Sequence, residues 1–392
     1  MAGESQAHAD ALFPDPHEAE ESGRRFNTGI LPSQEIVALA EAGTLRADPA
    51  IIPEQIQPSS LDLRLGPVAY RVRASFLPGK NHTVRHKIDA LGTHEIDLTK
   101  EAVLERGGVY IVPLLESVKL RKGLAGIANP KSSTGRLDIF TRLIADYATE
   151  FDRIPEGYAG PLYVEVSPRT FSIKVRQGSR LIQMRLRRGS PSPSAAQTRR
   201  LHDRIGLLSM PEGDDLPGDA IHRDVPVSVD LRGQGPDGIV GYKARAYTDI
   251  IDVDRVGAYP VADFWEPVTA PHGNLILDPN AFYILVSREE VRVPPDYAAE
   301  MLPFNPLKGE FRVHYAGFFD PGFGYSEDNS AGSRAVLEVR SFEVPFLLEH
   351  GQTVGQLVYE PLTRIPDKLY GQGIGSNYQR QGLKLSKHFT LG

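Results

Sequence analysis

The segment Val164-Glu165-Val166 occurs a second time in this chain, as Leu337-Glu338-Val339. In each copy a glycine follows the glutamate by 13 positions and a glutamine follows it by 18, at Gly178 and Gln183 and then at Gly351 and Gln356. A repeated spacing indicates a duplicated fold unit. A carboxylate within an apolar strand is also a candidate for chemistry.

Three further pairs of segments extend the repeat upstream. Tyr110-Ile111-Val112 and Glu116-Ser117-Val118-Lys119-Leu120 match Tyr283-Ile284-Leu285 and Glu289-Glu290-Val291-Arg292-Val293 at an offset of 173, and Ser60-Leu61-Asp62-Leu63-Arg64 matches Ser228-Val229-Asp230-Leu231-Arg232 at an offset of 168. We therefore predict two homologous domains, the second with five more loop residues.

Composition limits the classes of function. The chain has 392 residues, a net charge of −6 and no cysteine. This length allows two domains with their own cores, and the absence of cysteine excludes disulfides and thiolate metal sites. The mild charge gives no reason to expect nucleic acid as a partner. Without a long apolar window or a signal pattern, we expect a cytoplasmic enzyme with no membrane partner.

Short β-rich runs separated by glycine and proline predict an all-β fold, a sandwich or barrel with few short helices. The runs include residues 61–65, 109–112, 162–166 and 171–175, and one helix is expected from Ser33, as N-cap, to Gly43. The predicted organisation is a mobile N-terminal tail (1–25), a first domain (26–188), a linker (189–200), a second domain (201–361) and a C-terminal tail (362–392).

The segment Asn129-Pro130-Lys131-Ser132-Ser133-Thr134-Gly135-Arg136 is the strongest candidate for chemistry. Hydroxyls and backbone amides in such a turn donate to phosphate oxygens, and Arg136 adds a guanidinium fork. A polar surface turn remains the alternative. Glu165 is the second candidate: facing inward, it needs a partner, which Arg136 could provide. Facing outward, it would be an ordinary strand glutamate.

Metal-binding patterns are weak in this sequence. The 11 histidines form no HxE or HExxH arrangement, and there is no CxxC. A zinc-dependent nucleotide deaminase requires cysteine ligands, so this chain cannot build that site. We predict no protein-bound metal.

Several motifs, taken in order, resemble those of dCTP deaminases. They are Ile56-Gln57-Pro58-Ser59-Ser60-Leu61-Asp62-Leu63-Arg64-Leu65-Gly66, the turn Lys131–Arg136, Val164-Glu165, the Gly178-to-Gln183 turn, and the tail Tyr378-Gln379-Arg380-Gln381-Gly382 followed by Ser386 and Lys387. The resemblance covers most of residues 26–392 as two copies. It implies two tandem dUTPase-like distorted β-barrels, jelly-roll-like in form.

The resemblance also implies an activity, the hydrolytic deamination of dCTP to dUTP and ammonia. It implies no zinc, with Mg²⁺ carried by the nucleotide triphosphate. Glu165 would be the general base, Ser132 would hold the water, and Arg136 would orient Glu165. The implied nucleotide-binding residues are Lys131, Ser133, Arg153, Tyr378, Gln381 and Lys384.

The second copy departs from the family pattern. The register places Asn305 and Pro306 opposite Ser132 and Ser133, and Gly309 opposite Arg136. We therefore expect the second barrel, with Glu338, to be catalytically silent, while its tail serves the first barrel.

Two other functions remain open. The chain could be a dUTPase or a bifunctional deaminase and diphosphatase, although Pro155 falls where those enzymes have an aspartate. It could also be a nucleotide-binding regulator without turnover. The resemblance implies a homo-oligomer with a trimer-like arrangement of barrels, and leaves dTTP as a possible feedback inhibitor.

Overall fold

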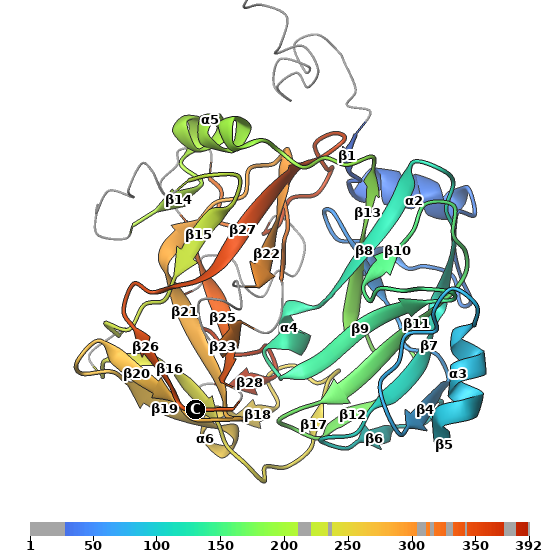
Figure 1. Ribbon diagram of the computed structural model, residues 1–392, viewed down its shortest axis with the longest axis horizontal. Helices are drawn as coiled ribbons and strands as arrows, with labels where there is room; N and C mark the ends of the chain where they lie inside the picture. The colour runs from blue at the N-terminus through green and yellow to red at the C-terminus, as the bar shows by residue number, and fades with distance from the viewer. Residues whose placement is uncertain are drawn as a thin grey trace, which may run out of the picture.

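The computed structural model describes residues 28–210, 221–233, 237–303, 311–313, 317–326, 332–341, 343–371 and 382–390. Within these ranges the chain forms two β-rich units joined at residues 189–194. In Figure 1 the first unit, blue to green, lies at the right, and the second, yellow-green to red, lies at the left.

The first unit consists of two antiparallel sheets. One has the order β1-β13-β8-β10, with β3 also paired to β13, and the other has the order β5-β4-β7-β11-β9, with β2 paired to β7. The elements are β1 (Gly29–Ile30), α2 (Ser33–Glu41), β2 (Leu45–Ala47), a 3-10 turn (Pro53–Gln55), β3 (Leu61–Leu63), β4 (Val68–Val72), α3 (Val84–Leu91), β5 (Gly92–Asp97), β6 (Ala102–Leu104), β7 (Tyr110–Lys119), β8 (Leu124–Pro130), α4 (Ser132–Gly135), β9 (Ile139–Ala145), β10 (Arg153–Ile154), β11 (Ala159–Pro168), β12 (Ile173–Val175) and β13 (Ile182–Arg188).

The second unit has the same plan, with sheets β19-β16-β21-β25-β23 and β15-β27-β22-β24. Its elements are α5 (Ala195–Ile205), β14 (Leu208–Ser209), β15 (Val225–Ser228), β16 (Ile239–Ala244), β17 (Ile251–Asp252), β18 (Tyr259–Pro260), α6 (Val261–Phe264), β19 (Trp265–Thr269), β20 (Asn274–Leu277), β21 (Phe282–Val291), β22 (Tyr297–Pro303), β23 (Phe311–Val313), β24 (Phe318–Phe319), β25 (Ser333–Ser341), β26 (Phe346–Glu349), β27 (Thr353–Pro361) and β28 (Phe389–Thr390).

Strand register confirms that the segments related by the offset of 173 are structurally equivalent. Glu165 on β11 pairs with Ile111 on β7, and Glu338 on β25 pairs with Ile284 on β21, so both pairs keep the offset of 173. The equivalent glycines also share a role. The N–H of Gly178 donates to the carbonyl of Leu65 at 2.8 Å, and that of Gly351 donates to Val229 at 2.9 Å. The predicted match of residues 60–64 to residues 228–232 is wrong, because Gln183 pairs with Asp62 whereas the equivalent Gln356 pairs with Pro226. The predicted all-β fold with few short helices is confirmed.

Two other predicted details are wrong. Pro32, not Ser33, is the N-cap of the first helix, and no side chain caps it. The predicted linker, 189–200, contains the start of α5, because Ser194 and Gln197 form a capping box that begins a helix at Ala195.

The hydrophobic core of the first unit extends into the second unit, which also has a buried cluster of its own. The buried cluster of the first unit includes Trp265, Phe282, Val336 and Leu385 from the second part of the chain. β17 also pairs in parallel with β12, which joins the units into one sheet with β6. The surface between them is therefore interior, and side chains from both units can meet there.

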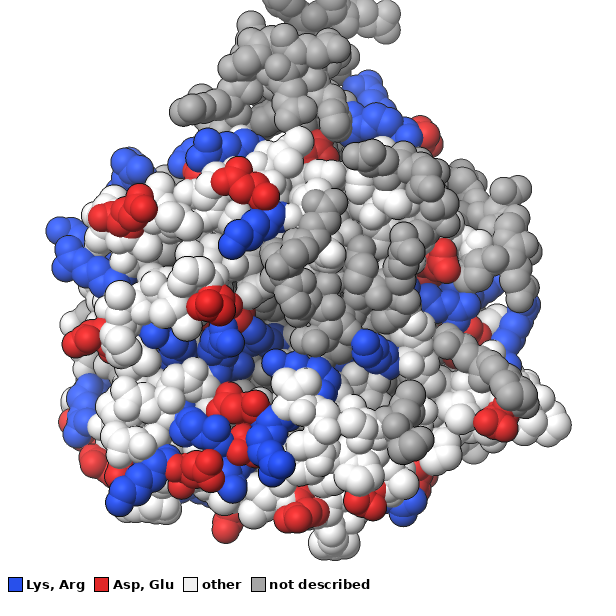
Figure 2. All heavy atoms as spheres, turned by 180° about the vertical axis from the view of Figure 1, so that it is seen from behind, with Lys and Arg blue, Asp and Glu red and all other residues white. Residues whose placement is uncertain are grey.

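Polar contacts cross the same boundary. Arg185 on β13, only 1% exposed, donates from Nη1 to the carbonyl of Ala299 at 2.8 Å and from Nη2 to Asp320 Oδ1 at 3.2 Å. Elsewhere the surface is mixed in charge: Figure 2 shows acidic and basic side chains interspersed on one face, with Lys and Arg gathered near its middle. Within the described residues, no helix is long and apolar enough to cross a membrane.

Candidate active site

The hydroxyl-rich turn forms a single helical turn, α4, that faces the second unit (Figure 1). Lys131 is its N-cap, and the backbone N–H groups of Thr134 and Gly135 donate to the Lys131 carbonyl at 2.8 and 2.9 Å. Ser133, Thr134 and Arg136 are buried. The turn is therefore part of the interior, and the alternative of a polar surface turn is wrong.

Arg136 lies beside the glutamate of the other unit. Its Nε is 3.9 Å from Glu338 Oε1, and its Nη1 donates to the carbonyl of Lys384 at 3.0 Å. Arg136 and Glu338 are both at least nine-tenths buried. The expected pairing of Arg136 with Glu165 is thus wrong, because the packing of the units brings β25, not β11, against α4.

Glu338 has the electrostatics of a general base. Burial raises the pKa of its carboxyl to about 7, and the positive charge of Arg136 opposes that rise. A carboxyl that titrates near neutral pH can both take and return a proton, which is what proton-transfer catalysis requires. The second unit, which was expected to be catalytically silent, thus places Glu338 beside the turn of the first unit.

Glu165 is held within its own unit. Arg142 on β9 lies directly opposite Glu165 on β11, and its Nη2 donates to Glu165 Oε1 at 2.7 Å. The Arg142 guanidinium also stacks on the ring of Phe151 at 3.5 Å and donates to Ser75 Oγ at 2.6 Å. Of the two orientations left open by the sequence, Glu165 takes the inward one. A cross-strand arginine binds its Oε1, while Oε2 is buried without a hydrogen-bond partner among the described residues.

A neighbouring carboxyl is also perturbed. Burial raises the pKa of Asp152 to about 7, while its hydrogen bond from the backbone N–H of Leu143, at 2.7 Å, and the charge of Arg142 lower it. The charge of Glu165 raises it further. The first unit therefore has two interacting carboxyls, Glu165 and Asp152, without the hydroxyl groups of the turn.

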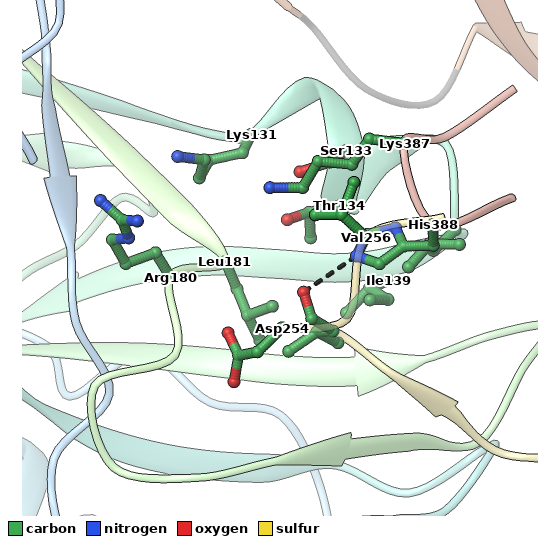
Figure 3. Close-up of a pocket in the computed structure, with 12 residues that line it drawn as sticks. Lys131, Ser133, Thr134, Ile139, Arg180, Leu181, Asp254, Val256, Lys387 and His388 are labelled. Carbon is green, nitrogen blue, oxygen red and sulfur yellow. Dashed lines mark hydrogen bonds between the residues drawn. The ribbon is translucent and has the colours of Figure 1, made fainter. Parts of the chain in front are cut away.

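A pocket of about 210 Å³ lies beside α4. Its polar lining consists of Lys131, Ser133, Thr134, Arg180, Asp254 and Lys387, together with His388. In Figure 3 the charged ends of Lys131, Arg180 and Lys387 turn toward the same side of the pocket. Burial, followed by the charges of Lys131 and Arg180, lowers the pKa of Lys387. Three cations with two hydroxyls suit a polyanion such as a chain of phosphates.

Two carboxylates, Asp62 and Asp254, bind polar side chains in and around this pocket. Lys131 Nζ forms an ion pair with the buried Asp62. Asp254 Oδ2 accepts a hydrogen bond from Ser179 Oγ at 2.6 Å and lies 3.5 Å from Arg176 Nη1. Asp254 belongs to the second unit, so the pocket, like the Arg136–Glu338 pair, draws on both.

The C-terminal segment 382–390 packs over α4. Ser386 Oγ donates to the Ser133 carbonyl at 3.0 Å and lies 2.9 Å from His388 Nδ1. His388 Nε2 lies 2.9 Å from the carbonyl of Val253, the bond drawn in Figure 3. β28 then pairs with β18. The segment thus joins both units at the turn, as expected of the tail.

Comparisons with known proteins match the two units to two family models. Residues 27–190 match the family model for the dCTP deaminase N-terminal domain, and residues 194–389 match that for the C-terminal domain. The chain belongs to the dCTP deaminase family. Members of this family are hydrolytic deaminases.

Solved and curated relatives give the same family. A crystal structure of 2′-deoxycytidine 5′-triphosphate deaminase from Agrobacterium tumefaciens is 54% identical, with a TM-score of 0.81, and the match covers 86% of this chain and all of that one. A "dCTP deaminase, dUMP-forming" from Parafrankia sp. is 35% identical over 40% of this chain and 74% of its own. A "dCTP deaminase" from Halorubrum lacusprofundi is 30% identical over 46% of this chain and 86% of its own.

The remaining predicted site residues are distributed as follows. Lys131 and Ser133 line the pocket, whereas Ser132 and Arg153 are not among its lining residues. Arg153 is exposed on β10, where its charge acts on Glu360 of the second unit. Lys384 contributes its carbonyl to Arg136. Tyr378 and Gln381 lie outside the described residues.

The sequence analysis assigned no role to Arg180 or Asp254, which line the pocket, and expected Glu338 to be catalytically silent. One signal was present: the first copy keeps the hydroxyl-rich turn, and the second keeps Glu338 and the C-terminal tail. Because only the first copy keeps the turn while both keep a glutamate, either Glu165 or Glu338 could have been its partner. Among the residues that the structure describes, no group of three or more acidic, histidine or cysteine side chains could hold a metal ion.

Proposed function

We propose that this chain hydrolyses dCTP to dUTP and ammonia at one site shared by its two units. The observation that carries the proposal is Glu338, buried beside Arg136 and α4, next to a pocket with three cations. The family and its named relatives support the substrate.

In the proposed reaction, ionised Glu338 takes a proton from a water molecule that attacks the amino-bearing ring carbon. The carboxyl then delivers protons to the ring nitrogen and to the departing amine, which leaves as ammonia. Arg136 holds Glu338 and offsets the charge that develops. A positioned base of this kind contributes about 10²–10⁴-fold in rate. Ser132, which begins the same turn, stays the predicted partner of the water.

The pocket would bind the triphosphate. Lys131, Arg180 and Lys387 provide charge, and Ser133 and Thr134 provide hydroxyl donors. We propose that Mg²⁺ arrives on the nucleotide and that the protein itself uses no zinc. Because Asp254 also lines this pocket, a cation carried by the phosphates would reduce the repulsion between carboxylate and triphosphate.

The test is an assay of the purified protein with dCTP after treatment with a chelator and restoration of Mg²⁺. We expect equal amounts of ammonia and deaminated nucleotide. Tight binding of dCTP without product would instead support the nucleotide-binding regulator. If neither binding nor product is found, the proposal fails.

A second candidate product is dUMP, because several relatives carry the name "dUMP-forming". Against it, Pro155 replaces the aspartate expected in the first unit. Asp320, in the corresponding turn of the second unit, already accepts a hydrogen bond from Ser59 Oγ at 2.6 Å and pairs with Arg185. Chromatography of the products, with a pyrophosphate assay, distinguishes dUTP from dUMP.

A further inference from the structure

Two buried ion pairs lie next to each other between α4 and β25. One is Arg136 with Glu338, and the other is Asp138 with Arg340. Within each segment the two charged residues are two positions apart. Glu338 and Arg340 therefore project from the same face of β25, since strand side chains alternate. The signs are reversed between the segments, so each unit offers one cation and one anion to the other.

The second pair is the tighter of the two. Arg340 Nη2 donates to Asp138 Oδ2 and, at 2.9 Å, to Thr170 Oγ1. Thr170 Oγ1 itself donates to Asp138 Oδ2 at 2.5 Å, and Arg340 Nη1 donates to the carbonyl of Asn280. Asp138 is 1% exposed and Arg340 5%. By contrast, the 3.9 Å between Arg136 and Glu338 is beyond hydrogen-bond distance, which leaves Glu338 able to exchange a proton.

Asp138 is also fixed through its backbone. Its N–H donates to the carbonyl of Gly135 at 2.9 Å, and its own carbonyl accepts from the N–H of Arg169 at 2.9 Å. Its φ of 54° lies in the left-handed region, where a non-glycine residue persists only when its surroundings hold it. The end of α4 is therefore anchored at Asp138, two residues beyond Arg136.

We propose that Asp138, Thr170 and Arg340 form a latch that positions Glu338 against Arg136. The inference rests on the proposed function of Glu338. Asp138 and Arg340 bind each other and would act on the reaction only through Arg136 and Glu338, so both are positioning residues. The latch fixes the C-terminal end of α4 to β25 across the unit boundary. A shift of either segment there would carry Arg136 or Glu338 with it.

The test compares Arg340→Met, Asp138→Asn and the double variant with the wild type. Asparagine suits the left-handed backbone at position 138. We expect each variant to lower kcat by about 10- to 100-fold, since small misplacements of reacting groups have effects of this size. KM should rise by a smaller factor than that by which kcat falls, because Asp138 lies between Leu137 and Ile139, which line the pocket, but is not itself a lining residue. The double variant should match the worse single variant, since both remove one interaction.

A shift of the pH profile of kcat shows whether the latch positions Glu338 or only stabilises the fold. If Glu338 moves away from Arg136, it loses the charge that lowers its pKa, so the acidic limb of kcat should move to higher pH. Arg334→Met is the matched control: Arg334 lies on the same strand and pairs with Asp230 of its own unit at 2.5 Å. We expect it to keep kcat within about threefold and to leave the pH limb unchanged.

Hydrogen exchange gives a readout that does not depend on turnover. The amide of Asp138 should exchange faster in Arg340→Met but not in Arg334→Met. If Arg340→Met fails to fold, Asp138→Asn carries the test. The latch is refuted if the variants keep the wild-type kcat per folded molecule and pH limb, or if the amide is unaffected. A wild type that does not deaminate dCTP would refute the proposed function instead, while the exchange result still reports on the latch.

Discussion

At the scale of the residue, Glu165 and Glu338 occupy equivalent strand positions but have different partners. Arg142 lies across the strand from Glu165 and donates to it at 2.7 Å. Glu338 meets Arg136 from the other unit at 3.9 Å. A salt bridge with good hydrogen bonds holds its carboxylate in place, whereas a longer ion pair leaves the carboxylate available for a proton. The difference in partners, not the repeat, sets the two glutamates apart.

Substitution of each glutamate by glutamine tests this assignment. We expect Glu338→Gln to lower kcat for ammonia release by about 10²–10⁴-fold, because the general base is lost. Glu165→Gln should keep deamination within about tenfold but lower the melting temperature, because Arg142 loses a buried partner. Steady-state kinetics and thermal unfolding measure the two effects. The reverse pattern, with Glu165→Gln inactive and Glu338→Gln active, would show that Glu165 is the general base.

The pKa of Glu338 predicts a pH dependence with a definite sign. Since burial raises this pKa to about 7, the rate should fall as pH drops through about 7 and the base becomes protonated. Arg136→Gln removes the charge that lowers the pKa, so in that variant any remaining activity should have its acidic limb at higher pH. Profiles of kcat/KM against pH measure the limb, and a limb unchanged by Arg136→Gln would contradict the pairing.

The same pKa has a consequence for stability. A raised folded-state pKa contributes stability that is fully present at acidic pH and is lost as pH rises toward about 7. Glu338→Gln carries no such loss, so it should gain stability relative to the wild type as pH rises from 5 to 8. Urea unfolding at several pH values checks this. A constant difference between the two proteins would show that Glu338 does not titrate in this range.

Among the elements, α4 is a turn whose functional character is predictable from the sequence but whose burial depends on its surroundings. Lys131 to Arg136 was predictable as a functional turn from its hydroxyls and cations. Its burial was not, because four helical residues cannot exclude water without neighbouring strands. α5 shows the opposite case: the signal was local, as Ser194 and Gln197 form a capping box that the serine- and proline-rich composition concealed.

The tail segment 382–390 gives a prediction at this scale. Ser386→Ala removes the hydrogen bond from Ser386 Oγ to the Ser133 carbonyl, so we expect KM for dCTP to rise about three- to tenfold. Thr390→Val is the matched control, because Thr390 Oγ1 makes only a 3.4 Å contact with the Tyr259 carbonyl. Initial rates over a range of dCTP measure both. Equal KM values for the two variants would mean that the tail does not hold the turn.

At the scale of the whole molecule, the two units form one structure rather than two independent domains. Trp265 and Phe282 of the second unit pack into the core of the first, and strand β17 of the second unit extends the small sheet of the first. A duplicated fold with two glutamates suggests two sites per chain. Among the described residues the packing suggests one, because it brings one hydroxyl-rich turn against one glutamate of the opposite unit.

The number of nucleotides bound per chain tests the shared site. With Glu338→Gln, which prevents turnover, calorimetry should find one dCTP per chain. Lys131→Met in the same background should abolish that binding, since Lys131 lines the pocket. Two dCTP per chain would indicate a second site around Glu165. The association of chains into a homo-oligomer and inhibition by dTTP remain predictions.

The duplication, the β-rich architecture, the turn at 131–136 and the resemblance to dCTP deaminases were all predictable from the sequence. These follow from strand alternation, glycine turns and motif order, which are local properties of the chain. The sequence did not predict that Glu338 meets Arg136 or that Asp138 binds Arg340, 202 positions away, and both contacts came from the tertiary structure. Pairings of this kind depend on how two finished units pack against each other. No local pattern encodes that packing, because each unit alone satisfies the same strand and turn rules.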